Sequence, residues 1–192
     1  MRCLNNMRLV VAITGASGVI YGKRLLEVLK EKNVETILVI SKQAEKILKM
    51  ELDIKREDLV KLAAKYYDSE DMGAPISSGS FKFDAMIIVP CSMKTLASIA
   101  CGIASNLIVR AADVAIKEGR KLILVPREAP LSPIHLRNML FLSEIGVIII
   151  PASPAFYHKP KTVKDLVDFI VGRILDVIGL KHELYKPYEG NF

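Results

Sequence analysis

The sequence predicts an α/β fold in which helices cover both faces of a doubly wound, mostly parallel sheet, forming a three-layer sandwich. Two observations support this prediction. Short apolar, β-prone runs alternate with helical patterns along the whole chain, and no internal repeat or linker interrupts them. The 192 residues, 51% of them hydrophobic, suffice for one domain with a sizeable core. We therefore interpret residues 1–192 as a single domain, with residues 1–6 as a disordered extension or an upstream start and residues 181–192 as a C-terminal tail.

Five segments have the length and the β-branched composition of buried strands. They are, in order, residues 8–14, 35–40, 84–89, 121–125 and 146–150. Seven segments repeat apolar residues at helical spacing or begin with helix-capping residues. They are the segment after Gly18, residues 42–50, 57–67, 96–101, 106–118 and 133–144, and the helix that Thr162 caps. Residues 71–80 and 151–160 have neither pattern and are predicted to be loops.

Charge and cysteine content narrow the class of protein. The net charge is +6 without any block of like charges, so nucleic acid is not the expected partner, although a basic surplus suits phosphorylated small molecules. The three cysteines form no C-x-x-C pair, and there is no signal peptide and no apolar run of membrane-spanning length. We therefore expect a cytoplasmic protein that does not bind membranes. The three histidines lack metal-ligand spacing, so no metal site is expected, and Cys91 is interpreted as a packed residue.

Small and hydroxyl residues occupy three strand-to-helix turns. The turn Gly15-Ala16-Ser17-Gly18 follows the first strand, Ser41 follows the second, and residues 92–95 (SMKT) follow the third. Backbone N–H groups of such turns can approach an anion at the edge where α/β sheets bind ligands. Taken singly, each hydroxyl is more often an ordinary helix cap. Together they indicate flavin mononucleotide, which needs one phosphate site and no acidic ribose ligand.

A dinucleotide-binding dehydrogenase is the alternative that the glycine turn raises. Such a site usually has an acidic residue after the second strand, where this chain has Ser41 and Lys42. The short-chain dehydrogenases also need a Tyr and a Lys one helical turn apart. Tyr157 and Lys161 have that spacing, but Pro160 lies between them and disfavours a helix there. The sequence therefore favours FMN over NAD.

The stretch Pro126-Arg127-Glu128-Ala129-Pro130 follows the fourth predicted strand. Pro130 biases Ala129 away from helix, so the stretch is predicted to be an extended turn at the carboxyl edge of the sheet. An Arg there suits a phosphate or carboxylate, and a Glu beside it suits proton transfer. The alternative is a surface turn whose two charges pair with each other.

Three further cations, Arg173, Arg110 and Lys117, are either ligand-binding residues or ordinary surface residues. Arg173 lies at the border of the apolar stripe of the last helix, where it is either a partly buried phosphate ligand or a snorkelling surface residue. Arg110 and Lys117 share one helical face with Asp113, which could pair with both on the surface.

Several segments together resemble one family, the UbiX-type flavin prenyltransferases, formerly described as aromatic acid decarboxylases. They cover nearly the whole chain in order, and they are ITGASG, SGSF, PCSMKTLASIA, NLIVRAADVAIKEGRKLILVPREAPLSPIHLRNML and PASPAFYHKPKTVKDLVDFIVGRILD. The resemblance implies a flavodoxin-like, Rossmann-like fold and a homo-oligomer, typically a dodecamer, with flavin sites between subunits. It implies transfer of a dimethylallyl group from dimethylallyl phosphate to reduced FMN, without a metal. The prenylated FMN would serve a separate UbiD-type decarboxylase.

The resemblance also implies roles for individual residues. FMN would contact the glycine turn, with Ser17 near the reactive flavin nitrogen, and the residues that hold it would be Gly15, Ala16, Ser17, Ser41, Ser92, Met93, Lys94, Thr95 and Arg127. The substrate phosphate would be bound by Tyr157 and Arg173, with Lys117 and Arg110 reaching in from neighbouring chains. Glu128 would transfer protons around the phosphate and the flavin. The catalytic residues would be Glu128, Ser17 and Arg127.

The chain departs from the family in one respect, because it contains no Trp. Members of the family can use a Trp near the allyl group, where a developing allyl cation is stabilised by a π face. The candidates for that face are the flavin ring itself or one of four aromatic residues, Phe81, Tyr157, Tyr185 and Tyr188.

Two other functions are compatible with this fold class. An FMN-dependent decarboxylase of the cysteine-decarboxylase type would need a catalytic His after the early helix, and no His precedes His135. A non-catalytic FMN carrier would need fewer cations than the turn at Arg127 and the last helix at Arg173 provide. The sequence therefore favours the prenyltransferase.

Overall fold

The structure is a computed structural model that describes residues 7–188 and residue 190. The predicted extension over residues 1–6 and the last residues of the tail lie outside this part of the chain. The strands are β1 (Arg8–Ile13), β2 (Glu35–Ile40), β3 (Lys65–Asp68), β4 (Ala85–Cys91), β5 (Lys121–Pro126) and β6 (Ile148–Ile149). The helices are α1 (Val19–Glu31), α2 (Lys42–Leu52), α3 (Arg56–Val60), α4 (Met93–Ala100), α5 (Leu107–Lys117), α6 (Pro133–Glu144), α7 (Val163–Ile178) and the short 3-10 helix η2 (Pro75–Ser77).

The strands form one six-stranded parallel sheet in the order β3-β2-β1-β4-β5-β6. Val11 in β1 lies opposite Leu38 in β2 on one side and Ile87 in β4 on the other. The chain leaves β1 toward β2 and later returns to the other side of β1 with β4. This reversal between β1 and β4 is a topological switch point, the place where open α/β sheets bind ligands. The doubly wound α/β prediction is confirmed.

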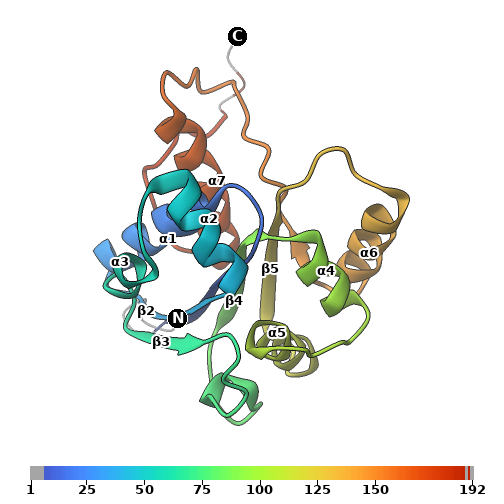
Figure 1. Ribbon diagram of the computed structural model, residues 1–192. Coiled ribbons are helices and arrows are strands. Elements are labelled where there is room, and N and C mark those ends of the chain that lie inside the picture. The colour runs from blue at the N-terminus through green and yellow to red at the C-terminus, as the bar shows by residue number, and fades with distance from the viewer. Residues whose placement is uncertain (1–6, 189, 191–192) are drawn as a thin grey trace.

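Side chains alternate between the two faces of each strand, so the sheet separates two cores. Leu9, Val11 and Ile13 point toward α1, α2, α3 and α7. Val10 and Ala12 point to the opposite face, which α4, α5 and part of α6 cover. The ribbon shows the two helical layers on either side of the sheet, with α7 behind α1 and with α4 and α6 on the opposite side (Figure 1). Both faces are buried, which explains why the strands are apolar almost throughout.

Helix α6 begins as predicted, with Ser132 as N-cap and Pro133 as its first residue. It is unlike the other long helices because Leu142 is its only buried residue. Its exposed apolar side chains include Ile134, Leu136, Leu140 and Phe141. An apolar surface of this kind is typical of a protein–protein contact.

The prediction of a helix over residues 57–67 is wrong. That segment contains the short helix α3 and the edge strand β3, which pairs with β2 so that Tyr66 lies opposite Leu38. Aromatic residues such as Tyr66 and Tyr67 favour strands, and the pairing with β2 outweighs the weak helical pattern. The last predicted strand, residues 146–150, is reduced to the two residues of β6, and α4 begins at Met93 rather than at residue 96.

Candidate functional site

A hydrogen-bonded link joins the loops that follow β1 and β4. Thr14 at the end of β1 is only 2% exposed. Its hydroxyl donates to the Pro90 carbonyl at 2.9 Å and accepts from the Ser92 N–H at 2.7 Å. Because both bonds are buried or partly buried, they hold the two loops side by side at the switch point. No local pattern in the sequence singles out Thr14, since its partners are more than 70 residues away.

A cavity of about 410 Å³ opens beside this link. Its walls come from the segments that follow β1, β2, β3 and β4, and they carry mostly hydroxyl, amide and ammonium groups. Among them are Gly15, Ser41, Ser92, Lys94, Thr95 and Asn106. The volume and the few convergent polar groups are typical of a small-molecule site. Five of the residues predicted to hold FMN line this one cavity.

The hydroxyls of this cavity also cap two helices. Ser41 Oγ accepts from the Ala44 N–H at 3.2 Å, at the N-terminus of α2. Ser92 Oγ accepts from the Thr95 N–H at 3.3 Å, at the N-terminus of α4, and lies 3.0 Å from Thr95 Oγ1. A hydroxyl that accepts from the backbone retains its own proton for donation. One hydroxyl of the Ser92–Thr95 pair donates to the other, so two helix N-termini and two free hydroxyl protons meet in the cavity, an arrangement that suits a phosphate.

Gly15 allows the first loop to pass close to α2. A Cβ at this position would lie 2.6 Å from Cγ of Gln43, so any larger residue would force the loop or α2 to move. The close approach leaves the loop backbone at the wall of the cavity, where a flat apolar ring could pack against it. The donor set of this cavity therefore fits FMN.

The N-terminus of α1 is already satisfied by a protein carboxylate. Glu51, in the last turn of α2, accepts from the Gly18 N–H at 2.9 Å and from the Val19 N–H at 3.2 Å. The glycine turn was expected to offer its N–H groups to a ligand anion, and in this structure Glu51 accepts from two of them. No local pattern in the sequence pairs Glu51 with Gly18, which lies 33 residues earlier.

The turn after β5 reaches the same loop. Arg127 Nε donates to the Ser17 carbonyl at 3.2 Å, and the side chain also passes close to Gly18. Glu128 Oε1 accepts from the Ala129 N–H at 3.1 Å. Burial raises the pKa of the nearby Tyr21, and the positive charge of Arg127 opposes that rise. Arg127 is thus directed at the glycine loop rather than at Glu128, which disfavours the surface-turn alternative.

Tyr157 and Arg173 belong to a second group of residues, around α7. Tyr157 makes edge contacts with Phe169 at 5.9 Å and with Tyr188 at 5.4 Å between ring centroids. Arg173 Nη1 donates to Asp176 Oδ2 at 3.0 Å and to the Tyr185 hydroxyl at 3.3 Å. Its side chain is 49% exposed, so one part of the guanidinium is held and another faces outward.

The remaining predicted site residues are distributed over the fold. Arg110 donates to the Ser77 carbonyl at 3.0 Å and pairs with Asp113 at 2.7 Å, while Lys117 is exposed at the end of α5. Ala16 and Met93 are both 8% exposed, Met93 within the core of the second face. One chain therefore brings five of the nine predicted FMN residues together in the cavity, but the contacts of the predicted phosphate ligands lie elsewhere.

The sequence showed no sign of a site directly after β3. Ser69 and Glu70 line the cavity directly after β3, the strand that had been interpreted as helix.

Cys91 is buried in the core, and burial raises the pKa of its thiol, as expected for a packed residue. Among residues 7–188 and 190, no cluster of His, Cys, Asp or Glu could hold a metal ion. Within the same residues, no helix combines the length and hydrophobicity needed to cross a membrane.

A parallel α/β sheet with a hydroxyl-lined cavity at its switch point is typical of a flavodoxin-like, nucleotide-binding class of protein. The chain matches the Flavoprotein family over residues 1–175. It is 57% identical over 182 residues, 95% of this chain and 98% of its relative, to the flavin prenyltransferase UbiX of Methanocaldococcus jannaschii. It is also 57% identical over 183 residues, 95% of this chain and 76% of its relative, to the mitochondrial flavin prenyltransferase PAD1 of Saccharomyces cerevisiae. The chain belongs to the flavin prenyltransferases of the Flavoprotein family.

Solved structures agree with this assignment. The crystal structure of AnUbiX (PadA1) in complex with FMN and dimethylallyl pyrophosphate has a TM-score of 0.95 and 49% identity, over 97% of this chain and 100% of that one. A dodecameric FMN-dependent UbiX-like decarboxylase from Escherichia coli O157:H7 has a TM-score of 0.94 and 51% identity, over 96% of this chain and 100% of that one. The FMN-dependent cysteine decarboxylase TvaF has a TM-score of 0.63 and 18% identity, over 75% of this chain and 89% of that one, which shows a shared fold alone.

Proposed function

We propose that this flavin prenyltransferase transfers a dimethylallyl group from dimethylallyl phosphate to reduced FMN. The observation that carries the proposal is the cavity at the switch point, where Ser41, Ser92 and Thr95 present hydroxyls at two helix N-termini. When bound there, reduced FMN supplies the nucleophile that accepts the dimethylallyl group.

The residues of the cavity hold and orient the flavin. The Ser41, Ser92 and Thr95 hydroxyls and the Lys94 ammonium bind the FMN phosphate and its chain, because each can donate to an anionic or hydroxyl oxygen. The backbone of Gly15, Ala16 and Ser17 supports the ring. Arg127, held against the Ser17 carbonyl, places a fixed positive charge beside it.

The cations outside this cavity bind the substrate phosphate. A chain of contacts through Phe169 and Tyr185 links Arg173 to Tyr157, and the two residues supply a guanidinium and a hydroxyl. As the phosphate leaves, its negative charge grows, and preorganised cations stabilise that charge. Glu128 exchanges protons with the phosphate and the flavin, since a carboxylate at the edge of the sheet can cycle between its two protonation states.

The active site is completed by neighbouring chains in a homo-oligomer, which we propose is a dodecamer. In one chain the contacts of Arg173 and Arg110 lie away from the FMN cavity, and Lys117 projects from the surface. Exposed apolar residues of α6, among them Ile134 and Leu140, provide a surface for subunit contacts. The E. coli relative is described as dodecameric, which agrees with this proposal.

Aromatic residues next to Tyr157 take the place of the missing Trp. Tyr188 contacts Tyr157, so these two rings form an aromatic wall beside the proposed phosphate ligands. Such a wall stabilises positive charge that develops on the allyl group. Phe81 instead packs under the guanidinium of Arg8, with its ring centroid 5.0 Å from the Arg8 Cζ, which disfavours a role for Phe81 in this wall.

The experiment that tests the proposed reaction is direct. The purified chain is incubated with reduced FMN and dimethylallyl phosphate, and the flavin product is analysed by mass spectrometry. We expect a flavin heavier by one dimethylallyl group. Dimethylallyl diphosphate in a parallel incubation identifies the preferred donor. Unmodified flavin from both incubations would contradict the proposal.

We also propose a recipient for the product and a cellular location for the chain. The prenylated flavin serves a UbiD-type decarboxylase, which is tested by adding the product to such an apo-decarboxylase and measuring CO₂ release. The free thiol of Cys101 is exposed, and it suits the reducing conditions of the cytoplasm, where we place the chain.

A further inference from the structure

The carboxylate of Asp176 gathers three partners at the C-terminal part of α7. Oδ2 accepts from Arg173 Nη1 at 3.0 Å and from the Tyr185 hydroxyl, and Oδ1 lies 3.0 Å from His182 Nε2. Arg173 and Asp176 are one helical turn apart on α7, whereas His182 and Tyr185 come from the segment that follows the helix. We refer to these four residues, Arg173, Asp176, His182 and Tyr185, as the α7 network.

The segment after α7 is fitted to the helix at Gly172. A Cβ at Gly172 would lie 2.6 Å from the Tyr185 ring and 2.8 Å from the His182 ring. The two rings also contact each other, with centroids 5.3 Å apart, and Tyr185 packs on Phe169 at 4.8 Å. The rings of His182 and Tyr185 therefore occupy the space that any other residue at position 172 would fill. The packing fixes where their polar atoms meet Asp176.

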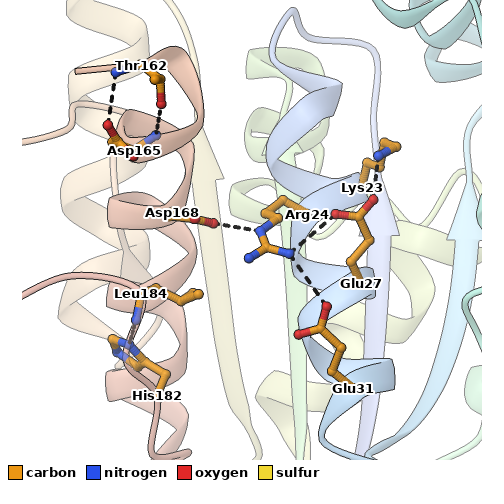
Figure 2. Close-up of polar contacts among 9 residues, drawn as sticks. All are labelled: Lys23, Arg24, Glu27, Glu31, Thr162, Asp165, Asp168, His182 and Leu184. Atoms are coloured by element: carbon orange, nitrogen blue, oxygen red, sulfur yellow. Dashed lines mark hydrogen bonds and ion pairs between the residues drawn. The ribbon is translucent and has the colours of Figure 1, made fainter. Parts of the chain in front are cut away.

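The hydrogen bonds of His182 assign its tautomer. The Leu184 N–H donates to Nδ1 at 3.1 Å, so Nδ1 is unprotonated and Nε2 carries the proton that is donated to Asp176. The His182 side chain is only 6% exposed and lies beside α7 (Figure 2). A neutral His182 leaves the charge of Asp176 to be balanced by Arg173. Burial by itself would raise the pKa of Asp176, but hydrogen bonds from Tyr185 and His182 hold that pKa below its ordinary value.

The network uses only one end of the Arg173 guanidinium. Nη1 carries two protons, and its two partners are Asp176 and Tyr185. Among the described residues, Arg173 makes its hydrogen bonds and its ion pair through this nitrogen alone. The edge formed by Nε and Nη2 therefore keeps three N–H donors, and this is the edge that binds phosphate through two parallel hydrogen bonds.

From this arrangement we propose that Asp176, supported by His182 and Tyr185, is a positioning residue that fixes Arg173 with its free edge presented to the substrate phosphate. The inference rests on the proposed function, in which Arg173 binds that phosphate. It assigns a role to the segment after α7, which the sequence predicted only as a C-terminal tail. Orienting the guanidinium in advance reduces the ordering that substrate binding would otherwise require.

The test measures flavin prenylation by the full chain, saturated with reduced FMN, at increasing concentrations of dimethylallyl phosphate. We expect Asp176→Asn to raise the KM for dimethylallyl phosphate about tenfold, while the affinity for FMN is unchanged. Tyr185→Phe keeps the ring over Gly172 and removes only the hydroxyl, so it should raise the KM in the same direction, by less. Tyr185→Phe therefore also tests the positioning role of the α7 network if Asp176→Asn folds poorly. The matched control is Glu183→Gln, which neutralises an exposed carboxylate of the same segment outside the network and should leave the KM unchanged.

A double-mutant cycle separates positioning from a merely structural role. In an Arg173→Ala background, Asp176→Asn should cause no further rise in KM, because the residue it positions is gone. A full additional rise in that background would overturn the inference. An unchanged KM in the single variants Asp176→Asn and Tyr185→Phe would also overturn it, and a lowered KM would show that the network competes with the phosphate. If Arg173→Ala itself leaves the KM unchanged, the proposed phosphate role of Arg173 is wrong and the inference fails with it.

Discussion

Arg24 in α1 and Asp168 in α7 form an ion pair between two helices, with Arg24 Nε 2.6 Å from Asp168 Oδ1 and side chains that are 17% and 11% exposed (Figure 2). Burial alone would lower the pKa of Arg24, but the hydrogen bond and charge of Asp168, together with Glu31 and Glu27, raise it. α1 begins directly after the glycine loop, and α7 carries Arg173. The pair therefore fixes the relative position of two helices that bear different parts of the proposed site.

We expect Asp168→Asn to lower the free energy of unfolding by roughly 3 kcal/mol, because it leaves the largely buried charge of Arg24 without its closest partner. Urea denaturation followed by far-ultraviolet circular dichroism measures this change. Lys23→Gln is the control, since the Lys23–Glu27 pair lies on the more exposed face of the same helix and should contribute less than about 0.5 kcal/mol. If both substitutions lower the free energy of unfolding equally, the buried Arg24–Asp168 pair stabilises the fold no more than the exposed Lys23–Glu27 pair.

The N-cap of α4 is expected to serve both stability and flavin binding. Ser92→Ala removes the hydroxyl that accepts from Thr95 N–H, at a cost of about 1 kcal/mol in the free energy of unfolding. The same substitution should weaken FMN binding in a fluorescence titration, because the hydroxyl lines the cavity. Ser132→Ala removes an equivalent cap, that of α6, and should cost similar stability without changing FMN affinity. Unchanged FMN binding in Ser92→Ala would remove Ser92 from the flavin site.

Glu128 and Arg127 are adjacent but are expected to act differently. Glu128→Gln preserves size and hydrogen bonding but cannot exchange a proton, so turnover should fall by roughly 10²–10⁴-fold while FMN and dimethylallyl phosphate still bind. Arg127→Ala removes the side chain held at the Ser17 carbonyl and should mainly weaken FMN binding. Rapid-mixing spectra of the reduced flavin distinguish binding from turnover. Normal turnover in Glu128→Gln would exclude Glu128 from the mechanism.

The two cysteines of the described chain should differ sharply in reactivity. Cys91 is fully buried, and burial raises the pKa of its thiol, so almost none of it is the reactive thiolate at neutral pH. Cys101 is exposed. In a Cys3→Ser background, a disulfide reagent should label Cys101 in the native protein and Cys91 only after unfolding. Rapid labelling of native Cys91, located by peptide mass mapping, would show that this part of the core opens readily.

The sequence by itself determined the features that depend on neighbouring residues. The strand β2 over Glu35–Ile40, the cap and first residue of α6, and Ser41 as the cap of α2 were all predicted, because apolar periodicity and helix capping are local properties. The resemblance to the prenyltransferases extended these patterns to a function, which the family membership supports.

The tertiary structure alone decided which distant groups meet. Glu51 fills the N-terminus of α1 across 33 residues, Thr14 joins Ser92 across 78, and Arg127 reaches Ser17 across 110. The strand β3 forms only because β2 offers an open edge, and Ser69 reaches the cavity only through β3. The contacts of Arg173 likewise depend on how the segment after α7 folds back over Gly172. Such contacts leave no local pattern in a sequence, because they arise where the sheet order and the packing of helices bring separate segments together.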